Sequence, residues 1–99
     1  GFSDKDSEVL AASVKIYRDL AANVTSRYLG NSANGEGLTN DLNELQEMKA
    51  ENNKLAAAIE HLTQAIQVLG DDGGNESVSI QAQGHVLKYI QSVGDLMNS

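Results

Sequence analysis

Apolar side chains recur every three or four residues through the middle of this chain, and that spacing is the period of an amphipathic helix. Neither proline nor glycine occurs between Leu38 and Leu69, so the pattern predicts one helix over residues 39–69. At 1.5 Å per residue this helix would be roughly 45–48 Å long. A single polar residue, Asn52, interrupts the apolar stripe, which consists of Leu38, Leu42, Leu45, Met48, Leu55, Ile59, Leu62, Ile66 and Leu69.

Shorter helical patterns lie on both sides of this segment, over residues 7–29 and 77–97, and glycine-rich turns separate the three. Gly30 and Gly70 each follow the last residue of a periodic segment, where a left-handed glycine commonly ends a helix. In the first helix the alternating steps of four and three predict an apolar seam made of Leu10, Val14, Tyr17, Ala21, Val24 and Tyr28.

Two glycines, Gly84 and Gly94, lie inside the third predicted helix. Each costs a helix roughly 1 kcal/mol relative to alanine. Such glycines either let a neighbouring helix approach closely or simply weaken the helix that carries them. The weaker helix is the favoured interpretation.

These lengths predict an all-α fold, an antiparallel three-helix bundle with a long central helix. Each end of the central helix would then be covered by only one shorter neighbour. Apolar surface left in water costs about 25 cal/mol per Å², so the mismatch favours a protein partner or a homo-oligomer. The expected partner-binding residues are the apolar ones at the two ends of the central helix: Leu38, Leu42, Leu45, Met48, Leu62, Ile66 and Leu69.

The alternative architecture is a four-helix bundle, which would form if the central helix breaks near Asn52. The apolar stripe misses one step between Leu45 and Asn52, and residues 51–53 are weak helix formers. The continuous helix is favoured because neither glycine nor proline marks a break. Asn52 would then either set the register or contact a partner, or it would face water at a kink.

Composition narrows the classes of function for this chain of 99 residues, whose length predicts a single domain. The net charge of −7 argues against nucleic-acid binding, which needs clustered lysine and arginine. No apolar run of 18 residues predicts a membrane span. The absence of cysteine excludes disulfides and thiol chemistry, and it is compatible with the cytoplasm or with a bacterial secreted or periplasmic protein.

Candidate chemical groups are few. His61 and His85 would lie at a similar height on adjacent antiparallel helices, and two histidines with a carboxylate can bind a divalent metal. Two separate, ordinary histidines are the favoured interpretation, because no HxxxH or ExxH spacing is present. No Ser–His–acid grouping or phosphate-binding glycine loop is evident, so neither enzymatic activity nor a cofactor is expected.

The sequence therefore predicts a non-enzymatic protein–protein interaction module that uses apolar grooves on its central helix. One alternative is a structural subunit of a bacterial secretion or filament-type assembly, which the proline-free and cysteine-free composition favours only by analogy. Another is a small-molecule or metal-sensing bundle that uses His61 and His85.

Overall fold

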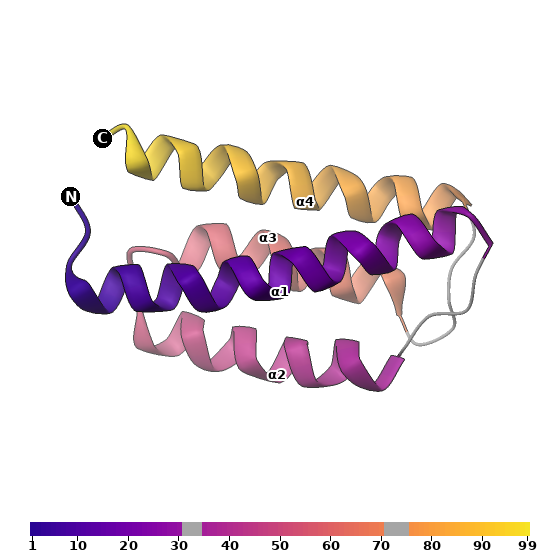
Figure 1. Ribbon diagram of the computed structural model, residues 1–99, viewed down its shortest axis with the longest axis horizontal. Helices are drawn as coiled ribbons and strands as arrows, with labels where there is room; N and C mark the ends of the chain where they lie inside the picture. Colours follow the sequence, from indigo (N-terminus) through magenta and orange to yellow (C-terminus); the bar gives the residue numbers. More distant parts are fainter. Residues whose placement is uncertain (31–34, 71–75) are drawn as a thin grey trace.

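The structure of the protein is a computed structural model that describes residues 1–30, 35–70 and 76–99. Over these residues the chain is all-helical, and consecutive helices run antiparallel, so both termini lie at the same end of the bundle (Figure 1). The helices are α1 (Asp4–Tyr28), α2 (Gly35–Glu51), α3 (Ala56–Leu69) and α4 (Glu76–Met97).

The predicted all-α class is confirmed, but the predicted three-helix bundle with an unbroken helix over residues 39–69 is wrong. That segment forms two helices, α2 and α3, which fold back on each other at Asn52. The structure is thus the four-helix alternative. None of the helices in the described part of the chain is long and apolar enough to cross a membrane.

The side chain of Asn52 stabilises the turn between α2 and α3. Its Oδ1 atom accepts a hydrogen bond from the backbone N–H of Leu55 at 3.0 Å, and its Nδ2 atom donates to Oδ1 of Asp6 at 2.8 Å. Asn52 is 6% exposed, so its side chain does not face water and is not accessible to a partner molecule. It replaces helical hydrogen bonds with side-chain bonds at the point where the helix stops.

Hydrophobic burial explains why the chain turns here. Interrupting a helix sacrifices a few backbone hydrogen bonds, each with a net value of about 0.5–1.5 kcal/mol, and Asn52 recovers part of this. Folding α2 onto α3 removes several leucine side chains from water, each contributing about 1.5–3 kcal/mol. Leu45, Leu55 and Leu62 are all at most 1% exposed, so burial outweighs the lost bonds.

Helices α1 and α3 are central to the bundle, because each of them contacts all three other described helices. Helices α2 and α4 lie on opposite edges, with α1 and α3 between them, and within the described residues they do not contact each other (Figure 1). The bundle measures 40 × 23 × 15 Å along its principal axes. Each edge helix therefore packs against α3 on one side and leaves its outer side uncovered.

The ends of the helices follow local sequence signals. Helix α1 begins at Asp4, three residues before the predicted start, because Ser3 and Asp6 form a reciprocal capping box. Gly30 and Gly70 adopt positive φ angles of 85° and 62° at the ends of α1 and α3, as predicted. Helix α2 begins at Gly35, before the predicted start at residue 39. The predicted turn that starts at residue 30 lies partly outside the described residues.

The core-facing side of α1 differs from the predicted seam. The buried side chains of α1 include two polar ones, Ser13 and Arg27. Ser13 bonds to Tyr89, and Nη1 of Arg27 donates to the carbonyl of Leu69 at 3.0 Å, at the end of α3. Val24 is buried as expected, but other seam residues are half-buried or exposed, namely Leu10, Val14, Tyr17, Ala21 and Tyr28. The predicted seam therefore lies at the edge of the α1 interface rather than at its centre.

Candidate interaction surface

In the described part of the chain, the large apolar side chains that stay exposed lie on two of the helices and on one helix end. Among the described residues they belong to α1, to its C-cap and to α4, while α2 and α3 contribute none. Single exposed hydrophobic residues are ordinary, but a set concentrated on two adjacent helices is typical of an interaction site. We call this surface the α1–α4 face; it consists of Val14, Tyr28, Leu29, Ile80, Leu87, Ile90 and Met97.

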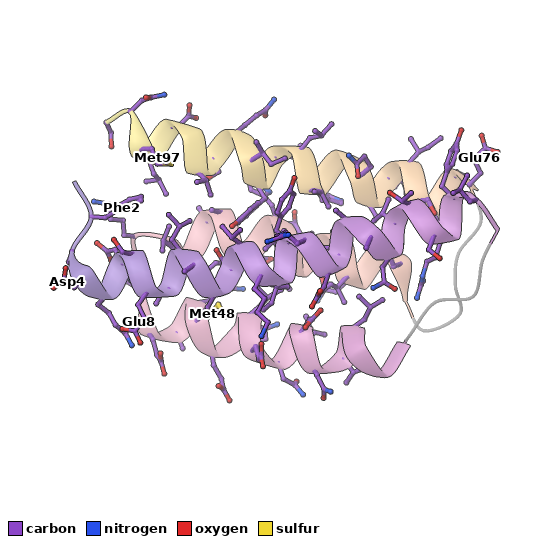
Figure 2. The ribbon with its side chains drawn as sticks, in the orientation of Figure 1. Phe2, Asp4, Glu8, Met48, Glu76 and Met97 are labelled. Carbon is purple, nitrogen blue, oxygen red and sulfur yellow. The ribbon has the colours of Figure 1, made fainter. Side chains whose placement is uncertain are left out.

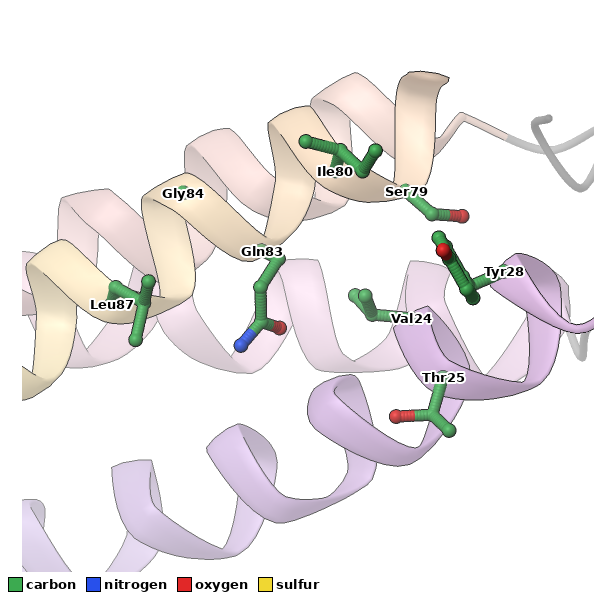
Figure 3. Close-up of a pocket in the computed structure, with 8 residues that line it drawn as sticks. All are labelled: Val24, Thr25, Tyr28, Ser79, Ile80, Gln83, Gly84 and Leu87. Atoms are coloured by element: carbon green, nitrogen blue, oxygen red, sulfur yellow. The ribbon is translucent and has the colours of Figure 1, made fainter. Parts of the chain in front are cut away.

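A groove of about 490 Å³ runs between α1 and α4 on this face. Val24 and Tyr28 project from α1, and Gln83 and Leu87 from α4, into the space between the two helices (Figure 3). No charged residue lines the groove, whose residues are Val24, Thr25, Tyr28, Ser79, Ile80, Gln83, Gly84 and Leu87. Its size and apolar lining suit an anchoring side chain from another molecule.

One buried polar group faces this groove without a hydrogen bond. Ser79 is 1% exposed, and its Oγ atom has no hydrogen-bond partner. A buried hydroxyl left unpaired costs about 1–3 kcal/mol. The nearby amide of Gln83 is exposed. The groove thus combines an apolar wall with one accessible amide, that of Gln83, which can hydrogen-bond to a bound chain.

Tyr89 fixes the relative position of α1 and α4 below the groove. The Tyr89 hydroxyl and Ser13 Oγ are 2.8 Å apart, and this hydrogen bond is buried. The rings of Tyr17 and Tyr89 stack with centroids 5.6 Å apart and an angle of 24° between their planes. Burial raises the pKa of Tyr89, so its hydroxyl stays neutral and keeps the bond. These contacts join α1 to α4 in the isolated chain.

Charge is distributed unevenly over the molecule. Helix α2 carries five acidic residues and one lysine, whereas α4 carries only Glu76, Lys88 and Asp95. Glu76 and Met97 mark the two ends of α4 along the upper edge of the bundle (Figure 2). Because α2 lies on the opposite edge, most of the negative charge is remote from the α1–α4 face.

The residues that the sequence assigned to partner binding lie in or against the core. Leu42 and Met48 are half-buried and pack against it. The others are at most 5% exposed: Leu38, Leu45, Leu62, Ile66 and Leu69. The prediction rested on apolar ends of a long helix that nothing covered. The turn at Asn52 removes that exposure, because α2 and α3 cover each other.

The two histidines gain no further ligand from the fold. His61 on α3 and His85 on α4 are half-buried, and the Nδ1 atom of each is buried without a hydrogen-bond partner. Among residues 1–30, 35–70 and 76–99, no group of three or more histidine, cysteine, aspartate or glutamate side chains could hold a metal ion. The pair therefore does not make a candidate metal centre here.

Sequence reasoning missed the α1–α4 face because α4 is apolar on two sides. Ala82 and Val86 face the core, whereas Ile80 and Leu87 are exposed and line the groove. A single helical pattern over residues 77–97 merged both sides into one stripe. The heptad spacing of Ile80 and Leu87, separate from that of the core residues, was the available signal.

Comparison with known proteins adds no further candidate, since no known protein family, no curated protein and no solved structure matches this chain.

Proposed function

We propose that this protein is a non-enzymatic helical module that binds another protein chain through its α1–α4 face. The observation that carries the proposal is the confinement of the exposed large apolar side chains of the described residues to α1, its C-cap and α4. Apolar area left in water costs about 25 cal/mol per Å², and burying that area against a partner recovers this free energy.

Three features of the face support this function. The groove is concave and uncharged, so a partner's apolar side chain enters it without removing an ion from water. Tyr89 holds both walls in place, which lowers the entropic cost of binding. The exposed Gln83 amide offers hydrogen bonds that orient the bound chain.

Site-specific photo-crosslinking tests the proposal. A photoreactive amino acid is placed at Leu87 on α4 or, as the matched control, at Gln46 on the exposed side of α2. In cells that naturally make the protein, we expect a discrete crosslinked protein from position 87 and none from position 46. A second substitution, Ile80→Asp, should abolish the adduct at position 87 because it places a charge on the apolar wall.

Two results would contradict the proposal. Equal labelling at positions 87 and 46 would mean that contacts with the face are non-specific. Absence of any protein adduct at position 87, with folding confirmed by circular dichroism, would mean that the face has no protein partner. The mass of the adduct also identifies whether the partner is a second copy or a different protein.

A further inference from the structure

We propose that the occupant of the α1–α4 face is a second copy of this chain, paired through α4 in an antiparallel, two-fold symmetric dimer centred on Leu87. This inference rests on the proposed function, because it names the partner for the same face. A two-fold interface must be self-complementary, since the same patch is used on both subunits. The outer side of α4 meets that requirement in its pattern of large and small residues.

The pairing places a large residue level with a glycine at each position away from the axis. When Leu87 lies opposite its own copy, Ile80 lies level with Gly94 of the partner subunit, and Ile90 lies level with the partner's Gly84. Ile80 and Ile90 are 58% and 43% exposed. Ile80 and Gly94 lie on nearly the same side of α4 as Leu87, so Ile80 projects where the opposing helix has no side chain.

The folded monomer does not require either glycine. A Cβ atom built at Gly84 or at Gly94 would meet nothing within 4 Å, and neither residue has a positive φ angle. Each glycine nevertheless weakens α4, because glycine in a helix interior is less favourable than alanine. A second helix packed against α4 supplies the close approach that the monomer lacks.

The groove fits the same arrangement. It is lined by α4 residues between Ser79 and Leu87, and Gly84 is near the middle of this segment. Ile90 of the partner subunit therefore arrives level with the groove. By symmetry, Ile90 of the first subunit reaches the partner's groove. A central apolar anchor that enters a preformed pocket is the usual source of affinity in an interface.

Electrostatics also favours α4 as the contact between two acidic chains. Each chain has a net charge of −7, so two copies repel each other in most orientations. Pairing through α4 keeps the acidic α2 helices on the outer edges, far from the interface. At physiological salt, charges separated by more than about 8 Å are largely screened. Helix α4 has a net charge of only −1, so pairing through it brings little like charge together.

Sedimentation of the purified full chain tests whether the dimer forms. We expect a monomer–dimer equilibrium between roughly 10 µM and 1 mM, the range of a modest interface. Leu87→Lys should weaken dimerisation at least tenfold, because the axis brings the two lysines together. Gln46→Lys on α2 adds the same charge at an exposed site and should leave dimerisation unchanged. Helicity by circular dichroism confirms that both variants fold.

Engineered cysteines test the register, since the natural chain contains no cysteine. Leu87→Cys should form a disulfide with its own copy under mild oxidation. Ile80→Cys alone should not, because the two copies of residue 80 are about 21 Å apart along the paired helices. A mixture of Ile80→Cys and Gly94→Cys should give the mixed disulfide.

The outcomes separate this inference from the proposed function. A chain that stays monomeric throughout the concentration range, or that crosslinks through Ile80→Cys alone, overturns the antiparallel dimer. If the photo-crosslinking experiment then captures a different protein at position 87, the proposed function stands without this partner. If neither experiment yields a contact at position 87, both are wrong.

Discussion

The two edge helices of this bundle, α2 and α4, lie on opposite sides of α1 and α3, and their outer surfaces differ in polarity. The outer side of α2 is polar and acidic, with Asn43, Glu44, Gln46 and Glu47 all exposed. The outer side of α4 carries Ile80, Leu87 and Ile90 together with two glycines. Water solvates the polar side chains of the α2 edge favourably, whereas the apolar side chains of the α4 edge stay exposed to water in a single chain.

The contrast shows why total apolar content is a poor guide to an interface. Helix α2 contributes leucines that the sequence assigned to a partner, yet these complete the core of the same chain. Helix α4 has enough apolar residues for both the core and an outer face. Position around the helix axis therefore decides whether a leucine supports folding or association.

The largest expected effect comes from truncating the inner side of α2. Leu45→Ala should lower the free energy of unfolding by about 2–5 kcal/mol, because Leu45 is fully buried. The matched change on the outer side of α4, Leu87→Ala, should cost less than about 1 kcal/mol, since Leu87 is 49% exposed. Urea denaturation followed by circular dichroism, at a concentration where the chain is monomeric, measures both. Equal costs would remove the distinction between core and face.

The turn that creates the separate α2 edge should be the next most sensitive site. Asn52→Ala should destabilise the protein by about 1–3 kcal/mol, because the Leu55 N–H and the Asp6 carboxylate lose a hydrogen-bond partner. The neighbouring change Asn53→Ala, at an exposed position, should stay within about 0.5 kcal/mol. If the two variants unfold at the same denaturant concentration, the side chain of Asn52 does not stabilise the turn.

Gly84→Ala should act in opposite directions on folding and on association. The added methyl group has open space around it in the monomer, so the monomer should gain about 0.5–1 kcal/mol of stability from helix propensity. Dimerisation should weaken several-fold, because the methyl group fills the place level with the partner's Ile90. Asn43→Ala on the exposed side of α2 should raise stability slightly and leave sedimentation unchanged. Stronger association of Gly84→Ala would contradict the proposed packing.

The smallest expected effect is a pH dependence of stability that arises from Asp41 on α2. Partial burial, with the nearby carboxylates of Asp19 and Glu44, raises the pKa of Asp41 to about 6. The folded state therefore binds this proton more tightly than the unfolded state, whose pKa is near 3.8. The stability contributed by the protonated form is lost as pH rises from about 4 to about 6.

Asp41→Asn should remove this decline. Because the carboxyl group is largely solvated, screening limits the increase in the free energy of unfolding of Asp41→Asn at pH 7 to roughly 0.5–1 kcal/mol. Thermal melts at pH 4, 5, 6 and 7 compare the variant with the natural chain. Glu47→Gln, at an exposed position on the same helix, serves as the control for removing one negative charge. Parallel pH curves for Asp41→Asn and the natural chain would contradict the assignment.

Local sequence signals predicted the helical class, two of the helix ends and the possible break. The glycines at 30 and 70 end their helices, because left-handed backbone is least costly for glycine. The skipped step in the stripe and the weak helix formers around Asn52 marked the position of the turn. The favoured interpretation was nevertheless the continuous helix, because the preference of the backbone alone does not include the gain from folding α2 onto α3.

The apolar period and the turn residues predict the helical segments, because both act over a few neighbouring positions. The turn at Asn52 and the choice of buried side on each helix depend on contacts between segments that are distant in the chain. Ser13 and Arg27 enter the core of α1 because Tyr89 and the end of α3 supply hydrogen bonds from distant parts of the chain. Because Ser13 and Arg27 face the core, Val14 and Tyr28 on the same helix stay exposed. A hydrogen-bond partner makes a polar residue favourable in a core, and spacing along one helix carries no record of a partner that comes from a distant segment.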